Sequence, residues 1–280
     1  MKKSSRGGDH KKRRPDGGAR NSDKESSGQR SPGRAGSGQH RRGGGRGQRS
    51  SRELRVIYED EAVIAVDKPA GLTAVPVEGT KMPSAWALVA DELQSIGERA
   101  YVVHRIDRFT SGVMLFAKTA RDRDALVKQF MAHTPVREYL AVVRGKLEAY
   151  EEETLIHYFR REGMFQKLTT PGDRQGAMAE LRYFVERPLR SASLIRVDLV
   201  TGLQNQIRVQ FAALGHPVVG DRKYSPDEAN ESRIDRVALH AVRLGFTHPR
   251  SEKQIFVDSK PPADFNSLVH ALTLPAREKR

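Results

Sequence analysis

Residues 104–118 read HRIDRFTSGVMLFAK, and this stretch decides how the rest of the chain is interpreted. Its second half, VMLFAK over 113–118, is a short apolar run that is typical of a buried strand. Its first half is a polar loop in which Asp107 lies between Arg105 and Arg108. Because opposite charges favour the ionised form of a carboxyl group, we expect Asp107 to be an anion that can act as nucleophile or base. From composition alone, an Asp–Arg ion pair that only orders the loop is the more common explanation of these residues.

Two later segments also place polar groups at the edges of predicted elements. VREYLAVVRGKL over 136–147 alternates like a strand and carries Tyr139, although a strand tyrosine is usually a core residue with a satisfied hydroxyl. TGLQNQIRVQ over 201–210 leads into a helix whose start gathers Asn205, Gln206 and Arg208. A helix start attracts anions, but ordinary capping and a solvent-exposed Arg208 explain the same pattern.

The remaining pattern alternates short strands with amphipathic helices. Strands are expected at 54–60, 62–69, 113–118, 136–147, 179–187, 193–202 and 236–249, and helices at 84–96, 119–133, 205–215 and 263–272. Ser84 is the expected N-cap of the first helix, and Gly215 is expected to end the third. The second helix should place Leu126, Phe130 and Met131 on one side, and the third should turn Ile207 and Phe211 to the core. This order predicts one α+β domain over 53–280, with a mixed, largely antiparallel sheet and flanking helices.

The first 52 residues differ sharply in composition from the rest. They contain 16 Lys or Arg, 4 Asp or Glu, and only three hydrophobic residues. The whole chain of 280 residues carries +14, so residues 53–280 carry only +2. A segment this poor in apolar residues cannot bury enough surface to fold, so a disordered Arg/Gly/Ser-rich tail is expected. Its charge favours polyanions such as RNA, although a solubilising or localising tail would have the same composition.

Composition also excludes several classes of protein. The chain has no cysteine, which rules out disulfides, thiolate metal sites and cysteine nucleophiles. No apolar run is long enough to span a membrane, and the first residues lack the apolar core of a secretory signal. We therefore expect a soluble intracellular protein with no membrane association, and a monomer in a bacterial cytoplasm is the default.

Five segments together resemble the motifs of the RluA-type pseudouridine synthases, a family of RNA uridine isomerases. HRIDRFTSG over 104–112 resembles the family's His-Arg-Leu-Asp loop, which ends in Thr-Ser-Gly. The segments DKPAG at 67–71, REY at 137–139, TGLQNQIR at 201–208 and LGHPVVGD at 214–221 resemble its other motifs. Five motifs in the family's order make a chance match very improbable. The resemblance covers roughly 54–250 and implies the pseudouridine synthase catalytic fold.

The resemblance also implies roles for individual residues. Asp107 would be the catalytic aspartate, and Arg208 would pair with its carboxylate. Tyr139 would be the active-site tyrosine that stacks near the target base, and Arg105 would wedge into RNA when the uridine is flipped out. The residues that the resemblance places against the substrate are His104, Arg105, Arg108, Thr110 and Gln206.

The third motif departs from the family pattern at three positions. The family usually has Arg where this chain has Leu203, His where it has Asn205, and His where it has Gln210. We expect these positions to contact RNA or support the loop, because Asp107, Tyr139 and Arg208 all match. The departures therefore bear on the choice of substrate more than on activity.

The implied reaction breaks the bond between ribose C1′ and uracil N1, turns the base, and joins C1′ to C5. Nothing is oxidised and no group is transferred, so we expect neither a cofactor nor a metal. Ribosomal RNA is the first expected substrate and transfer RNA the second. A non-catalytic RNA-binding or ribosome-assembly protein on the same fold is the main alternative. A carboxylate glycosidase is a third interpretation, although such enzymes need a second facing carboxylate, which the sequence does not offer.

Overall fold

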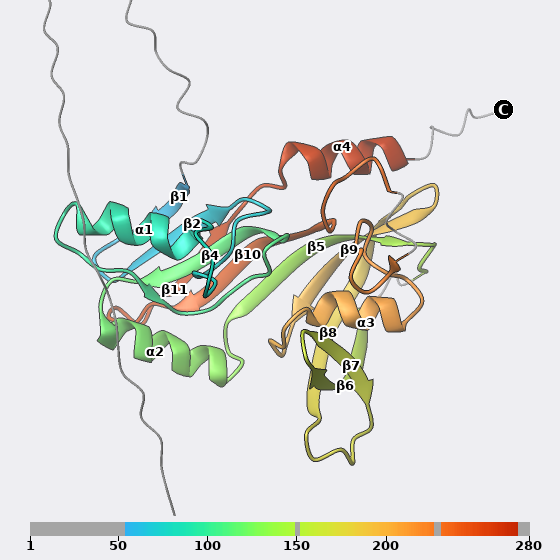
Figure 1. The fold of residues 1–280 in the computed structure, drawn as a ribbon, viewed down its shortest axis with the longest axis horizontal. Coiled ribbons are helices and arrows are strands. Elements are labelled where there is room, and N and C mark those ends of the chain that lie inside the picture. The colour runs from blue at the N-terminus through green and yellow to red at the C-terminus, as the bar shows by residue number, and fades with distance from the viewer. Residues whose placement is uncertain (1–53, 149–151, 227–230, 274–280) are drawn as a thin grey trace, which may run out of the picture. The chain divides into compact units, whose positions relative to one another are not determined.

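A computed structural model describes residues 54–148, 152–226 and 231–273, all within a compact unit that spans Ser50–Arg280. The tail predicted over 1–52 lies outside the described residues. The described part contains an eleven-stranded sheet and four long helices, which is the predicted α+β class (Figure 1).

The sheet runs in the order β1-β2-β4-β10-β5-β9-β8-β6-β7, with β11 paired to β10 and β3 to β4. The strands are β1 (Arg55–Glu59), β2 (Val63–Lys68), β3 (Tyr101–Val102), β4 (Ser111–Ala117), β5 (Val136–Arg144), β6 (Glu153–Glu162), β7 (Phe165–Thr169), β8 (Ala177–Pro188), β9 (Ala192–Leu199), β10 (Leu239–Thr247) and β11 (Gln254–Asp258). Pairing between these strands is antiparallel except where β4 meets β10. The prediction of a mixed, largely antiparallel sheet is thus confirmed.

The four predicted helices form close to their predicted bounds. They are α1 (Ala85–Gln94), α2 (Ala120–Met131), α3 (Gln206–Ala213) and α4 (Ala263–Leu272). Ser84 caps α1 by accepting a hydrogen bond from the Ala87 N–H, as its residue type predicts. Gly215 follows the last residues of α3 with a φ of +83°, the left-handed conformation that ends many helices.

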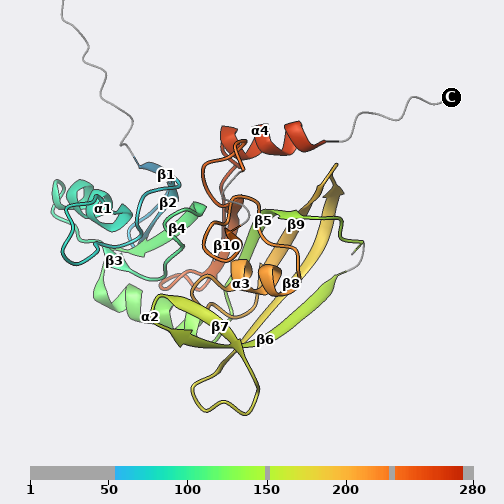
Figure 2. The same ribbon diagram turned by 45° about the vertical axis from the view of Figure 1, so that its right-hand side comes forward.

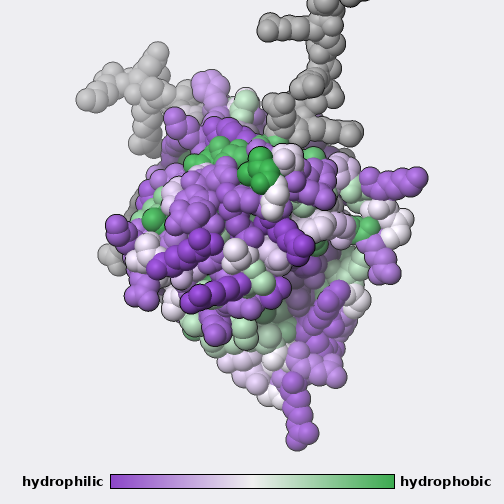
Figure 3. Space-filling view, turned by 90° about the vertical axis from the view of Figure 1, so that its left-hand side faces the viewer, coloured by the Kyte–Doolittle hydropathy of each residue, from purple (hydrophilic) through white to green (hydrophobic). Residues whose placement is uncertain are grey.

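Helices α1 and α2 cover opposite faces of β2 and β4 (Figures 1 and 2). Met114 and Phe116 of β4 pack with the α1 side, and Leu115 packs with Leu126 of α2, as strand alternation requires. Met131 is 75% exposed, so the prediction that it lies on the same side of α2 as Leu126 was wrong, because a residue five positions later points about 140° away around a helix. The face shown in Figure 3 is largely hydrophilic, with only small hydrophobic areas.

The strands β6 and β7 have no counterpart in the sequence-based prediction. They form a hairpin, and of its residues only Phe159 is fully buried. An edge hairpin with so little burial lacks the apolar alternation by which strands are recognised. The hairpin matters for the site, because α3 lies beside β7 (Figure 2).

Gly112 lies in β4 opposite Ala241 of β10, where these two strands pair in parallel. It has a φ of +115°, and a Cβ atom built there would be 2.1 Å from the Ala241 carbonyl oxygen of β10. Only glycine lets β4 approach β10 this closely, and the loop that carries Asp107 immediately precedes it.

We therefore expect Gly112→Ala to lower the free energy of unfolding by about 3 kcal/mol or more, because backbone strain and a main-chain clash add together. Gly71→Ala is the matched control, since Gly71 also has a positive φ but no atom within 4 Å of the added Cβ. Urea denaturation of both variants measures the difference. Equal destabilisation of the two would show that close packing against Ala241 contributes nothing.

Candidate active site

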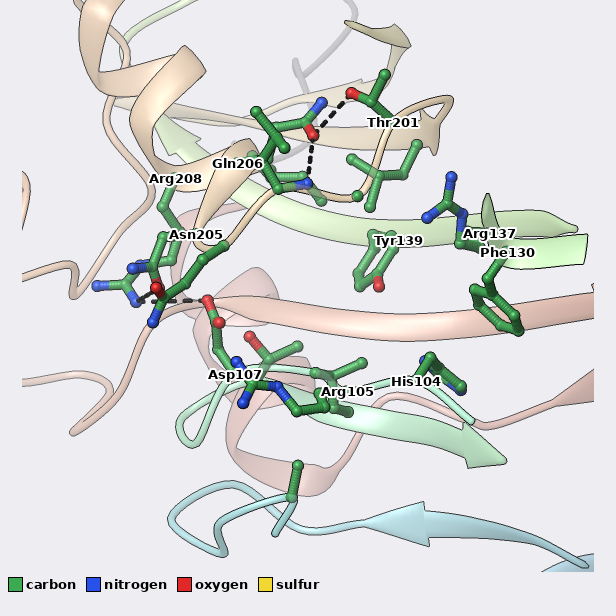
Figure 4. A pocket seen from close by; sticks show the side chains of 18 of the residues that line it. His104, Arg105, Asp107, Phe130, Arg137, Tyr139, Thr201, Asn205, Gln206 and Arg208 are labelled. Carbon is green, nitrogen blue, oxygen red and sulfur yellow. Dashed lines mark hydrogen bonds and ion pairs between the residues drawn. The ribbon is translucent and has the colours of Figure 1, made fainter. Parts of the chain in front are cut away.

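A cleft of about 780 Å³ lies where the loop after β3 faces β5 and the start of α3 (Figure 4). Every residue predicted to act on the substrate lines it: His104, Arg105, Asp107, Arg108, Thr110, Tyr139, Gln206 and Arg208. Residues of three motif segments that are distant in the sequence, 104–112, 137–139 and 201–208, thus come together in one cleft. The side chains differ, however, in whether their polar groups are available to a substrate.

Lys68, the last residue of β2, holds the loop that carries Asp107. Its side chain is fully buried, and Nζ donates hydrogen bonds to the carbonyl oxygens of Pro69, Leu72 and Arg108 at 3.0, 2.8 and 3.1 Å. Burial lowers the pKa of Lys68 to about 7. The Gly71 N–H also donates to the Arg108 carbonyl oxygen, at 2.8 Å. This lysine, which sequence reasoning did not assign to the site, therefore ties two motif segments together.

The two arginines that flank Asp107 in sequence do not neutralise it. The Arg108 Nε donates to the Gly71 carbonyl oxygen at 3.0 Å, and the guanidinium lies 5.1 Å from the centre of the Phe109 ring. Arg105 is exposed and lines the cleft beside Asp107 (Figure 4). Sequence neighbours in a turn point in different directions, so the expected Arg–Asp–Arg arrangement does not form.

The cations that reach Asp107 come from other parts of the chain. Arg208 Nη1 lies 3.5 Å from Oδ2 of Asp107, whose side chain is 25% exposed. Burial raises the pKa of Asp107 above its ordinary value, whereas the charges of Arg208, Lys223 and Lys68 lower it without cancelling the effect. Opposite charges do favour the ionised form of Asp107, as expected, but they come from Arg208, Lys223 and Lys68, and desolvation has the larger and opposite effect on its pKa.

Arg208 is itself held by a buried carboxylate. Its Nε and Nη2 donate to the two carboxylate oxygens of Asp221, both at 2.7 Å, and Asp221 is fully buried. Nη1 donates to the Asn205 side-chain oxygen at 2.8 Å and faces Asp107. The arginine is only 7% exposed, which corrects the interpretation of an exposed residue at the helix start. The predicted pair with Asp107 forms, but Asp221 is the principal partner.

Tyr139 lies between the two sides of the cleft (Figure 4). It is 9% exposed, and burial together with the charge of Asp107 raises its pKa to about 12. The phenol is therefore neutral at physiological pH. A neutral ring with a hydroxyl group can contact a base by its face and exchange a hydrogen bond at its edge.

His104 and Gln206 line the cleft, but Nε2 of His104 and both side-chain polar atoms of Gln206 already have partners. His104 Nε2 accepts a hydrogen bond from the Leu115 N–H at 3.0 Å, and burial lowers its pKa to about 3. Gln206 Oε1 accepts from the Thr201 hydroxyl and the Leu203 N–H, at 2.8 and 2.9 Å. The Gln206 side chain thus shapes the cleft, which weakens its assignment as a direct substrate ligand, whereas His104 keeps Nδ1 as a candidate contact.

Thr110 differs from these two residues. Its hydroxyl is buried and has no hydrogen-bond partner among the described residues, although the Thr110 N–H donates to the Asp107 carbonyl oxygen at 3.1 Å. The hydroxyl therefore stays a candidate contact for a substrate in the cleft.

The three departures from the family pattern have structural explanations. Leu203 packs against the small cluster around Phe159. Asn205 adopts a left-handed φ of 56°, and its Nδ2 donates to the Tyr224 hydroxyl at 3.0 Å. Gln210 is fully buried, and its Nε2 donates to the Leu155 carbonyl oxygen at 3.0 Å. Asn205 thus supports the loop as expected, whereas Gln210 is inaccessible and does not contact RNA.

The described residues lack two further features. Among residues 54–148, 152–226 and 231–273, no three His, Asp or Glu side chains come together as a metal site would require. Within the same residues, no helix is long and apolar enough to cross a membrane.

The family model described as RNA pseudouridylate synthase matches residues 62–213, and the chain belongs to this family of RNA-modifying isomerases. The "Ribosomal large subunit pseudouridine synthase D" of Zymomonas mobilis is 34% identical over 80% of this chain and 74% of its own length. The "Dual-specificity RNA pseudouridine synthase RluA" of Vibrio cholerae is 37% identical over 78% of this chain and 88% of its own. The resemblance drawn from the five motifs is thereby confirmed.

The fold is shared with solved structures as well. "Human RNA Pseudouridylate Synthase Domain Containing 4" superposes with a TM-score of 0.64 at 19% identity, covering 78% of this chain and 92% of that one. "Human RNA Pseudouridylate Synthase Domain Containing 1" superposes with a TM-score of 0.60 at 23% identity, covering 75% of this chain and 84% of that one. The family model and the two bacterial relatives show that the protein is an enzyme, a pseudouridine synthase. They favour this activity over both the non-catalytic alternative and the glycosidase.

Proposed function

We propose that the protein converts uridine in ribosomal RNA to pseudouridine and that Asp107 is its catalytic residue. The observation that carries the proposal is a desolvated carboxyl group that lies in the cleft and is paired with Arg208. The ribosomal substrate rests on the printed name of the Zymomonas mobilis relative, which refers to the large ribosomal subunit. Transfer RNA is the second candidate.

Asp107 can act in two ways, and both begin by breaking the C1′–N1 bond. The carboxylate either attacks C1′ directly or removes a ribose proton. In each case the electron pair of the broken bond leaves with the uracil. After the base turns, C5 bonds to C1′. On the first route the bond between Asp107 and C1′ breaks in this step, and on the second route Asp107 returns the proton to the ribose. The C5 proton is then lost, and N1 takes up a proton. The target nucleotide has to leave its stack to bring its sugar to Asp107, so base flipping is part of the proposal.

The other residues position the reacting groups. Arg208 holds the Asp107 carboxylate in place, because Asp221 fixes the guanidinium from behind. Tyr139 supports the face of the flipped base. Arg105, exposed at the rim, is suited to the space that the flipped uridine leaves in the RNA. Arg108 and Thr110 complete the proposed contacts on the loop.

The electrostatics of Asp107 predict how activity responds to pH. Activity needs the ionised carboxylate, so it falls as pH decreases through the raised pKa of Asp107. Lys223 lowers that pKa, so Lys223→Gln is expected to move the acidic limb of the kcat/KM profile to higher pH. Lys253→Gln, at an exposed lysine in the turn before β11, is the control and should leave the limb in place. A limb that does not move in Lys223→Gln would argue against Asp107 as the titrating group.

The basic segment 1–52 is proposed to attract RNA through its charge. Deleting residues 1–50 is expected to weaken RNA binding and to reduce the slope of log K against log salt concentration, because fewer counterions are released. Thermal unfolding should be unchanged. Filter binding at several salt concentrations measures the effect, and an unchanged affinity with an unchanged slope would contradict the proposal that this segment binds RNA.

The cytoplasmic location and the monomeric state stay predictions.

Pseudouridine mapping of total RNA, with and without the gene, tests the proposed substrate. Loss of one or two sites in ribosomal RNA is the expected result. Loss of sites in transfer RNA alone would move the proposal to that substrate. An unchanged map, together with no product from the purified enzyme on unmodified ribosomal RNA, would contradict the proposal.

A further inference from the structure

Arg137 is a buried cation that the proposed reaction has not used so far. It is the second residue of β5, it lines the same cleft, and it is 7% exposed. Its Nη2 donates to the Val200 carbonyl oxygen, and its guanidinium lies 5.9 Å from the centre of the Phe130 ring. A Cβ atom at Gly202 would be 2.6 Å from Nη1, so this glycine leaves the space that the arginine occupies.

The charge of Arg137 is only partly compensated, because Asp198 raises the pKa of the guanidinium without forming an ion pair with it. Among the described residues it forms no ion pair within 4 Å, and its buried Nε has no hydrogen-bond partner. Arg208, equally buried, has both oxygens of Asp221. Burial lowers the pKa of Arg137, as it does for a desolvated cation with little compensation. Because such burial is costly without a partner, the unused donors indicate a group that arrives with the substrate.

The position of Arg137 indicates which part of the substrate it meets. Asp107 and Arg137 lie toward opposite ends of the group of side chains in Figure 4, with Tyr139 between them. The pKa of Tyr139 responds to the charges of both residues, which places it near each. If the proposed function holds and ribose C1′ lies at Asp107, the flipped base extends along Tyr139 toward Arg137. The phosphates of the RNA strand stay at the mouth of the cleft, whereas the flipped base enters it most deeply. The buried Arg137 therefore meets the base and not a phosphate.

The chemistry of the detached base matches a buried guanidinium. When the C1′–N1 bond breaks, the uracil carries the electron pair, and its negative charge is shared with O2 and O4. A half-turn about the axis through N3 and C6 exchanges N1 with C5 and O2 with O4. One arginine can therefore bind a carbonyl oxygen both before and after the base turns.

We propose that Arg137 binds a carbonyl oxygen of the target uracil and stabilises the uracil anion while the base turns between its two attachments to C1′. A fixed donor in a water-poor site stabilises developing negative charge more than it stabilises the neutral base. Arg137 thus lowers the barrier to bond breaking, whereas Asp107 acts at the sugar. Cytosine would present an amino donor where uracil has O4, so the same guanidinium disfavours it.

Arg137→Gln tests this role, because glutamine keeps hydrogen-bonding capacity without the charge. On RNA containing uridine we expect kcat to fall about 10²- to 10³-fold, as when one donor to a developing anion is removed, with little change in KM. The same RNA with 5-fluorouridine at the target is the second substrate, because fluorine stabilises the uracil anion by itself. The rate at which 5-fluorouridine is consumed in a single turnover is measured for both enzymes. We expect the substitution to slow this rate by a factor at least ten times smaller than the factor by which it slows the uridine reaction.

Arg137→Lys and Arg243→Gln complete the experiment. Lysine keeps the charge without the planar fork, so a smaller loss is expected, and this variant carries the test if Arg137→Gln does not fold. Arg243, on β10 and paired with Asp258 at the surface, controls for loss of an arginine and should leave both rates unchanged.

Three results would overturn the proposal. Equal loss on both substrates would indicate a structural role through Val200. A raised KM with unchanged kcat would indicate a phosphate contact. Unchanged kinetics would show that the guanidinium is not used. Failure of the wild-type enzyme to form pseudouridine is a separate result, because it would contradict the proposed function itself.

Discussion

Asp107→Asn is expected to reduce pseudouridine formation about 10⁴-fold or more while leaving RNA binding nearly unchanged. The amide can neither attack C1′ nor accept a ribose proton, and loss of a residue that acts directly on the reacting atoms has effects of this size. The rate is measured under single-turnover conditions on unmodified ribosomal RNA, and binding is measured on the same RNA. Appreciable product from this variant would refute the assignment of Asp107.

Stability provides a second readout for the same substitution. Because the folded-state pKa of Asp107 is raised, its ionisation opposes folding, and that cost appears as pH rises through the raised value. Asp107→Asn should therefore be at least as stable as the wild type at pH 7, with the difference shrinking below the ordinary pKa of an aspartate. Asp124→Asn, on the exposed side of α2, is the control and should change neither activity nor stability. Destabilisation of Asp107→Asn at pH 7 would mean that the carboxylate holds the fold together instead.

Arg208→Met is expected to have the largest effect on stability, lowering the free energy of unfolding by about 3–5 kcal/mol. The reason is that Asp221 would keep a fully buried carboxylate with only the N–H groups of Lys223 and Tyr224 as donors. Turnover should also fall, because Asp107 would lose the side chain that positions it. Chemical denaturation and single-turnover kinetics measure the two effects.

The two roles of Arg208 can be separated with Asp221. In the double variant Arg208→Met/Asp221→Asn the buried charge is gone, so stability should partly return while turnover does not. The exposed pair Arg243–Asp258 is the matched control, and breaking it should cost less than about 1 kcal/mol. Recovery of turnover together with stability would mean that Arg208 acts only as a structural residue.

Local sequence patterns were enough to predict the class of fold and most of its elements. The helices α1, α2, α3 and α4 follow from apolar positions at helical spacing and, for α1, from the cap at Ser84. The strands β2, β4, β5 and β9 follow from apolar runs that are buried in the sheet. The hairpin β6–β7 escaped prediction because its strands bury few side chains. Periodicity reports burial, so it identifies elements only where burial is extensive.

The sequence by itself also determined that the chain carries the family's five motifs, with Asp107 in the loop before β4. Only the tertiary structure decided the surroundings of that carboxyl group. The resemblance already implied Arg208 as its partner, but the structure shows that Asp221 holds this arginine, that Arg108 binds Gly71 instead, and that Lys68 holds the loop from another strand. Motifs specify which residues are present and in what order. The pKa of Asp107 and the burial of Arg137 with little compensation, in contrast, depend on desolvation and on contacts between distant segments, which exist only after the chain has folded.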